Sequence, residues 1–108
     1  MTDFSINEMH KMQKALQDKY KDRWEPICAD VGKNELLWMI GEIGEVIDIV
    51  KKHGGTKASQ DEELRKALVE EMADVLMYYN DVMLCYGITA DELKQVYVEK
   101  FAKNMSRW

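Results

Sequence analysis

Two pairs of acidic residues, each spaced three positions apart, are the side chains of this sequence best suited to chemistry. The first pair is Glu42 and Glu45, and the second is Glu71 and Asp74. In an α-helix, residues i and i+3 lie on the same face, so each pair would direct two carboxylates the same way. Apolar residues recur on the same helix faces as both pairs. Carboxylates on such inward-leaning faces repel one another and are costly to desolvate unless a cation or bound protons neutralise them.

A divalent metal ion is the simplest means of neutralising these acids. Carboxylate oxygens without Cys or His ligands suit Mg²⁺ or Mn²⁺, which bind few carboxylates, keep several waters and then accept phosphate oxygens. Either acid pair alone occurs by chance in many charged helices. The informative feature is the combination of two pairs on two helices that a short glycine-containing loop would make antiparallel neighbours. The pattern therefore predicts a metal site between two helices.

Helix start and stop signals divide the chain into four helices. Three predicted starts have a hydroxyl side chain three residues before a glutamate, a pattern that satisfies free amides at a helix N-terminus: Ser5, Ser59 and Thr89. Asn34 is expected to cap the second helix, and Gly54 and Gly87 to end the second and third. The predicted helices span residues 6–22, 35–53, 60–86 and 90–105, with a flexible connection over 54–59 and a longer irregular one over 23–33.

Length and composition favour a single all-α domain over residues 1–108, similar to a four-helix bundle. The chain has one proline and six glycines, and no segment reads as a strand. A net charge of −5 disfavours binding to nucleic acid polymers, and no apolar run approaches the ~20 residues of a membrane span. The start of the chain lacks a signal-peptide layout, so a cytoplasmic location is expected. Cys28 and Cys85 belong to no CxxC pair and are expected to be reduced thiols.

The sequence resembles the MazG-like all-α nucleoside triphosphate pyrophosphohydrolases, whose signature is Glu-x-x-Glu, a spacer and Glu-x-x-Asp. Here the signature reads Glu42-Ile-Gly-Glu45, twenty-five residues, then Glu71-Met-Ala-Asp74. The resemblance covers residues 24–107. Several features are similar in form to the dCTP pyrophosphatase branch: Gly41 before Glu42, Trp24-Glu25, Asn34, the segment 70–78, and Lys100 and Asn104 ahead of Arg107. Cys28 and Lys52 stand where that branch has a histidine and a second tryptophan.

This resemblance implies hydrolysis of a nucleoside or deoxynucleoside triphosphate to the monophosphate and pyrophosphate. It also implies that Glu42, Glu45, Glu71 and Asp74 hold Mg²⁺, with Mn²⁺ as a possible substitute. A bound metal would lower the pKa of a water molecule, and Glu42 or Glu45 would accept the water's proton. Family members are dimers or tetramers, and eight methionines and three tryptophans offer more apolar surface than a small bundle buries. A homodimer or homotetramer is therefore expected.

Candidate substrate contacts lie outside the acid pairs. Four polar or basic residues recur at near-helical spacing in the last helix, and some of them can form a cationic edge for the phosphates: Lys100, Lys103, Asn104 and Arg107. Basic residues at a helix C-terminus are also common without any ligand, because they complement the helix dipole. For the base and sugar, the candidates are Trp24, Asn34, Trp38 and Tyr78. Core packing is the alternative for Trp38 and Tyr78, and helix capping is the alternative for Asn34.

Two other functions compete with this one. Di-iron carboxylate oxidases use Glu-x-x-His on two helices, but neither His10 nor His53 follows a glutamate by three residues. The non-enzymatic alternative is a helical interaction or regulatory module whose acidic faces are only solvated.

Overall fold

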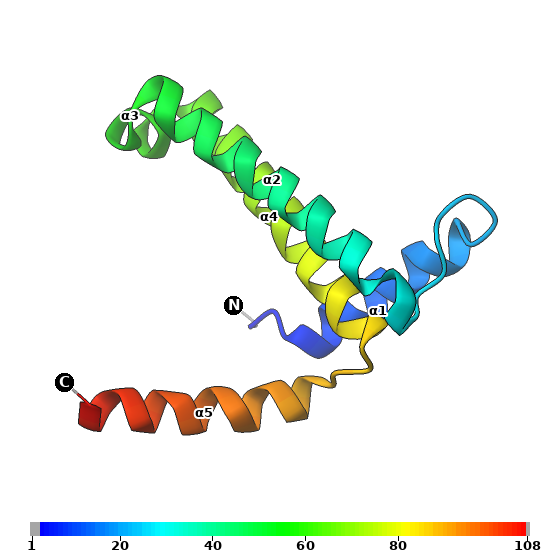
Figure 1. Cartoon of the computed structure of the whole chain (residues 1–108). Helices are drawn as coiled ribbons and strands as arrows, with labels where there is room; N and C mark the ends of the chain where they lie inside the picture. The colour runs from blue at the N-terminus through cyan, green and yellow to red at the C-terminus, as the bar shows by residue number, and fades with distance from the viewer. Residues whose placement is uncertain (1–2, 108) are drawn as a thin grey trace.

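The computed structural model describes residues 3–107, and this part of the chain contains helices and no strand (Figure 1). The predicted all-α class is therefore confirmed. The elements, in chain order, are α1 (Ile6–Lys19), the 3₁₀ helix η1 (Ala29–Val31), α2 (Gly32–His53), α3 (Gly55–Gln60), α4 (Glu62–Cys85) and α5 (Ala90–Arg107). The four predicted long helices correspond to α1, α2, α4 and α5. No helix in residues 3–107 is both long and apolar enough to cross a membrane.

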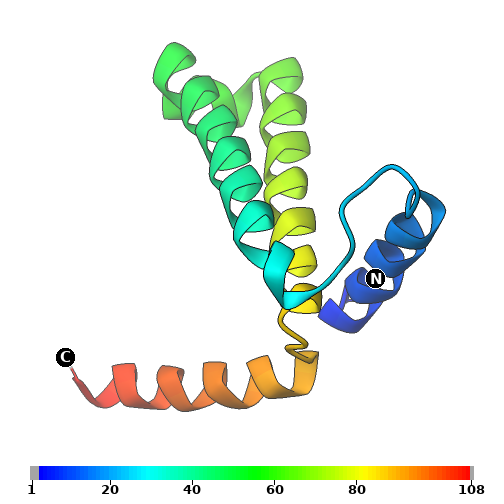
Figure 2. The same cartoon turned by 45° about the vertical axis from the view of Figure 1, so that its right-hand side comes forward.

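The helices α2 and α4 form an antiparallel pair along the length of the molecule, and their mutual contact is the most extensive of any two elements (Figure 2). α2 ends at Gly54, whose φ of 85° is rarely adopted by other residues, and whose amide donates to the Val50 carbonyl at 2.8 Å. The predicted glycine stop is thus confirmed. This pair places the two acid-bearing helices side by side.

The prediction of a flexible connection over residues 54–59 is wrong, because most of this segment forms the short helix α3. α3 packs against both α2 and α4, and its Ala58 is only 1% exposed. Burial of this small side chain between the two long helices stabilises a helix that is too short to form alone.

Two of the predicted helix caps are also wrong. Asp61, not Ser59, caps α4: its carboxylate accepts from the Leu64 amide at 3.0 Å, whereas the Ser59 hydroxyl donates to the Thr56 carbonyl inside α3. α2 begins at Gly32 because η1 leads directly into it, so Asn34 lies inside the helix and caps nothing. The Ser5 and Thr89 caps are confirmed by hydrogen bonds from the Glu8 and Glu92 amides.

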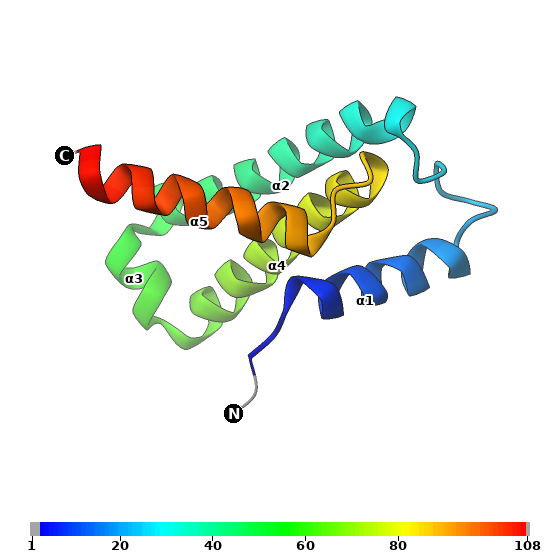
Figure 3. The same cartoon turned by 90° about the horizontal axis from the view of Figure 1, so that it is seen from below.

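α1 packs against α4, and hydrogen bonds between polar side chains link the two helices. Its two buried residues are His10 and Gln13, and the Gln13 side-chain amide donates to Asp81 of α4 at 2.9 Å. A second link joins the Asn80 amide to the Met9 sulfur at 3.3 Å. α1 ends at Lys19, earlier than the predicted residue 22. The irregular segment that follows crosses from α1 to the start of α2 (Figure 3).

α5 stands clear of the α2 and α4 pair over most of its length (Figures 1 and 2). It begins just after Gly87, whose φ is 68°, and none of its residues is buried. Large apolar side chains are exposed along α5, α2 and α4, including Phe101, Met105, Trp38, Ile40 and Val69. The described chain on its own therefore leaves much of its apolar surface in contact with solvent.

Candidate functional site

Three of the four predicted metal-binding acids converge between α2 and α4. One carboxylate oxygen from each of Glu42, Glu71 and Asp74 lies within 4.8 Å of the other two, and all three residues are half-buried. Glu71 and Asp74 share a face because they are three residues apart on α4, and the antiparallel pairing brings Glu42 of α2 opposite them. We refer to these three residues as the acid cluster.

The closeness of these carboxyl groups changes their protonation. The pKa of Glu71 lies above its usual value, chiefly because its carboxyl group hydrogen-bonds to that of Glu42. Partial desolvation and the neighbouring negative charges, those of Glu42 first, raise the pKa of Glu71 further. The repulsion among these neighbouring negative charges favours the binding of a positive charge at the cluster. A divalent cation would meet the same need with oxygen ligands of the kind that Mg²⁺ and Mn²⁺ prefer.

Glu45, the fourth predicted acid, lies one turn beyond Glu42 on α2. It is exposed and is not a member of the acid cluster. Three of the four carboxylates therefore meet, and the fourth, that of Glu45, lies beside them. Glu45 is thus an exposed carboxylate beside the acid cluster and outside it.

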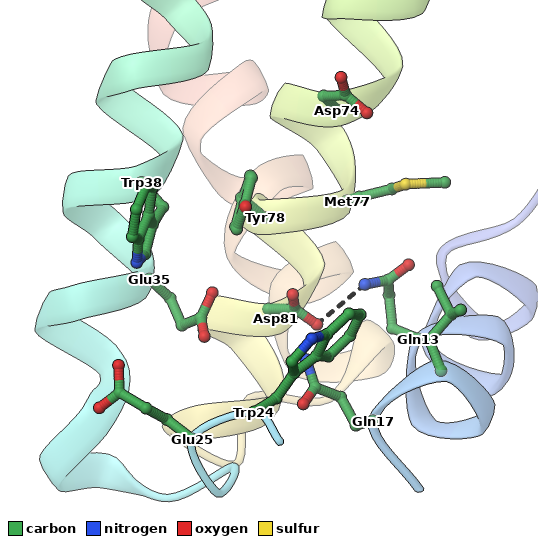
Figure 4. A pocket seen from close by; sticks show the side chains of 11 residues that line it. Gln13, Gln17, Trp24, Glu25, Glu35, Trp38, Asp74, Met77, Tyr78 and Asp81 are labelled. Carbon is green, nitrogen blue, oxygen red and sulfur yellow. Dashed lines mark hydrogen bonds between the residues drawn. The ribbon is translucent and has the colours of Figure 1, made fainter. Parts of the chain in front are cut away.

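A pocket of about 360 Å³ adjoins the acid cluster and includes Asp74 in its wall (Figure 4). Its lining comes from α1, α2, α4 and the segment after α1: Gln13, Leu16, Gln17, Trp24, Glu25, Glu35, Trp38, Asp74, Met77, Tyr78 and Asp81. The volume falls within the range of small-molecule sites, about 300–1,000 Å³. Aromatic and polar side chains thus surround a space that begins at the acid cluster.

Three of the four residues predicted for a base and sugar pocket line this space, namely Trp24, Trp38 and Tyr78. Asn34 is not in the lining. Its side-chain amide instead donates to the Glu25 carboxylate at 3.0 Å, and Glu25 does line the pocket. Asn34 therefore positions a wall residue.

Trp24 is held at the pocket by the residues around the end of α1. Its indole stacks on the Tyr20 ring, with centroids 4.7 Å apart, and its amide donates to the Tyr20 carbonyl at 2.8 Å. Tyr20 is the C-cap residue of α1, so the end of that helix fixes the position of the tryptophan. The sequence indicated the aromatic residue but not this support.

The pocket also contains two nearly buried acids that the sequence analysis did not single out. Glu35 is 9% exposed and Asp81 is 5% exposed. Burial raises the pKa of both carboxyl groups, and the charges of Asp81 and Glu25 raise the pKa of Glu35 further. A signal was present in the sequence, because Glu35 precedes Glu42 by seven residues and Asp81 follows Asp74 by seven. Seven residues are two helical turns, which places both acids on the faces of the acid cluster.

Tyr78 lies between the acid cluster and these two acids. Burial raises the pKa of its hydroxyl group, and the charges of Glu42, Glu35, Asp81 and Asp74 raise it further. The hydroxyl therefore stays protonated at neutral pH and remains a hydrogen-bond donor. It is placed to contact a ligand that extends along the pocket.

The predicted phosphate-binding residues do not meet the acid cluster within one chain. All four are exposed on the C-terminal half of α5: Lys100, Lys103, Asn104 and Arg107. This half of α5, at the red end of the colour scale, lies well away from α2 and α4 in Figure 1. If these residues contact a phosphate at the acid cluster, they would do so from α5 of a second copy of the chain.

The fold and this site together define a class of all-α proteins in which carboxylates from two antiparallel helices face a ligand pocket. Comparison with protein families identifies the class. The model of the MazG nucleotide pyrophosphohydrolase domain matches residues 32–106, which include the whole acid cluster, and the chain belongs to this family. The match is to the family as a whole and does not separate its branches. No curated protein and no solved structure matches the chain.

Proposed function

We propose that this protein hydrolyses a nucleoside or deoxynucleoside triphosphate to the monophosphate and pyrophosphate. The observation that carries the proposal is the acid cluster opening onto a pocket with aromatic walls, in a chain of the MazG nucleotide pyrophosphohydrolase family. Carboxylates at one end suit a metal-bound polyphosphate, and indole rings farther along suit a nucleobase. The similarity of residues 41–45 to the dCTP pyrophosphatase branch makes a deoxynucleotide a natural substrate for such a pocket.

In this proposal the residues of the acid cluster hold Mg²⁺, with Mn²⁺ as a substitute. Their oxygen-only ligand set fits either ion, and their mutual repulsion supplies a reason to bind one. When bound, the ion supplies charge neutralisation for phosphate oxygens and a more acidic water. Glu45 lies beside the cluster and is not one of the three acids that would hold the metal. Its carboxylate is therefore available to accept the proton of the attacking water. Glu42 is the alternative acceptor if Glu45 instead joins the metal.

The pocket sets the direction of the substrate. The triphosphate lies at the Asp74 end, beside the acid cluster, and the nucleoside lies towards Trp24 and Trp38 (Figure 4). The Tyr78 hydroxyl, between the two ends, contacts the middle of the molecule. Fixing the nucleoside at one end and the phosphates at the other positions a single phosphoanhydride bond for attack.

We further propose that the active form is a homo-oligomer, a dimer or a tetramer. The apolar side chains of α5 are exposed in one chain, with Tyr97 and Met105 each 71% exposed. Association through these surfaces would bury them, and it would allow α5 of one copy to reach the pocket of another. Lys100, Lys103 and Arg107 would then neutralise the phosphates of a substrate bound by a second chain, and the Asn104 amide would donate a hydrogen bond to them. The protein would act in the cytoplasm, on the nucleotide pool.

Metal dependence tests this function. Turnover of nucleoside triphosphates should require millimolar Mg²⁺, and Asp74→Asn should abolish it while circular dichroism shows an intact helical fold. Glu63→Gln is the matched control, because Glu63 is an exposed acid in the first turn of α4, far from the cluster. Mg²⁺ should raise the melting temperature of the wild-type protein and of the control but not that of Asp74→Asn. A protein with no turnover and no response to Mg²⁺ would be the non-catalytic helical module.

A further inference from the structure

The end of the pocket away from the acid cluster is lined by carboxylates. Glu35 and Asp81 each lie two helical turns from the cluster, about 10 Å along α2 and α4. The Glu35 side chain points towards α4, and the Asp81 carboxylate points towards Gln13 of α1 (Figure 4). Glu25 adds a third acid, and no basic side chain lines the pocket within the described residues. A nucleobase occupying this end would meet hydrogen-bond acceptors.

The two buried carboxylates differ in their partners. Asp81 accepts a hydrogen bond from Gln13 at 2.9 Å, and Gln17 is a second donor to it. Glu35 is also nine-tenths buried, but among residues 3–107 no side chain or backbone group donates to its carboxylate. The Glu35 oxygens are not among the fully buried atoms without a partner, so they remain accessible from the pocket, where a ligand can supply a donor. Asp81 thus holds α1 in place, whereas Glu35 is left to interact with the contents of the pocket.

We propose that Glu35 determines base specificity by accepting a hydrogen bond from an exocyclic amino group, so that the pocket prefers amino-bearing bases to their oxo counterparts. This inference rests on the proposed nucleotide hydrolysis and names the substrate class of the same site. Cytosine and adenine each carry such an amino group. Uracil and hypoxanthine carry a carbonyl oxygen at the same position.

The preference follows from what a carboxylate can and cannot do. An ionised carboxylate only accepts hydrogen bonds, so an amino group next to it is a partner and a carbonyl oxygen is repelled. A site that is built to bind one polar group discriminates strongly against an analogue lacking it, because the buried protein group is then left unpaired. Trp24 and Trp38 contact any base through its ring face and therefore add affinity without this selectivity.

Matched substrate pairs provide the test. We expect kcat/KM for pyrophosphate release to be higher for dCTP than for dUTP, and higher for dATP than for dITP if the pocket admits purines. The expected ratio is roughly tenfold to a hundredfold, as for a hydrogen bond to a charged group. Equal rates within the dCTP and dUTP pair would overturn the inference while leaving nucleotide hydrolysis intact. No turnover of any nucleotide would instead remove the proposed function, and the inference with it.

The variant Glu35→Gln assigns the preference to its residue. Glutamine has the same size but offers an amide donor as well as an acceptor, so it should reduce the dCTP to dUTP ratio to near one or reverse it. The Glu63→Gln control, far from the pocket, should retain the wild-type ratio. Isothermal titration with dCMP and dUMP supplies a readout that does not depend on turnover, and it should show the same change in preference. An unchanged ratio in Glu35→Gln, with the fold intact, would assign selectivity to other residues.

Discussion

The hydrogen bond between Gln13 and Asp81 makes the attachment of α1 to α4 testable. Gln13→Leu keeps a similar volume but removes the donor, so the carboxylate of Asp81, which is 5% exposed, loses its 2.9 Å partner. A hydrogen bond to a charged group contributes about 1.5–3 kcal/mol, and Gln17 remains as a second donor to the Asp81 carboxylate. We expect a loss of about 2 kcal/mol, which for a chain of this size lowers the melting temperature by roughly 8–16 °C.

Chemical and thermal denaturation at neutral pH measure this loss directly. Asp81→Asn is the matched comparison, because its neutral amide oxygen still accepts from Gln13 and avoids the cost of a buried charge. Burial raises the pKa of Asp81, so the loss in Gln13→Leu should shrink as the pH falls from 7 towards that pKa and the carboxyl group becomes neutral. A melting temperature for Gln13→Leu equal to the wild-type value at pH 7 would refute this account of how α1 is held.

Three further predictions concern the pocket, protonation and assembly. Trp24→Ala should change the ranking of kcat/KM among bases, whereas Lys100→Ala should lower kcat/KM by a similar factor for every nucleotide, because all of them carry the same phosphates. The pKa of Glu35 is raised in the folded protein from its ordinary 4.5, so the free energy of unfolding should fall as the pH rises above 4.5 and this carboxyl group ionises. Glu35→Gln removes the titrating group and should make this fall between pH 4.5 and 7 smaller. Phe101→Asp should shift the mass found by light scattering to that of a monomer and lower turnover, if α5 joins the copies.

The acid-bearing helices could be predicted because their sequence signals are local. The Ser5 and Thr89 hydroxyls bond to amides three residues later, and Gly54 and Gly87 adopt the positive φ angles that end helices. A glycine-containing connection between two apolar helices leads to antiparallel packing. These local rules are sufficient to predict that Glu42 lies opposite Glu71 and Asp74.

The remaining features depend on tertiary contacts that spacing does not reveal. Asp61 and Ser59 are both acceptable caps, and the choice between them is made by the packing of Ala58 in α3. Asn34 is not the cap of α2 because η1 leads into the helix and places its N-cap at Val31, three residues earlier.

Hydrophobic periodicity also fails for the inner face of α1. There the buried residues are His10 and Gln13, because the facing surface of α4 offers Asn80 and Asp81. The two most buried positions of α1 are therefore polar, although the apolar Met9 and Leu16 beside them are half-buried. Glu35 was overlooked for the same reason, since a buried acid looks like an exposed one in sequence.

The products of a single turnover test the central claim most directly. The protein, in excess over an α- and γ-labelled deoxynucleoside triphosphate and with Mg²⁺ present, should convert it to the monophosphate and pyrophosphate in one step. The same mixture with EDTA, or with Asp74→Asn in place of the wild-type protein, should leave the triphosphate intact. Diphosphate and orthophosphate as the first products, or an equal rate in EDTA, would contradict the account.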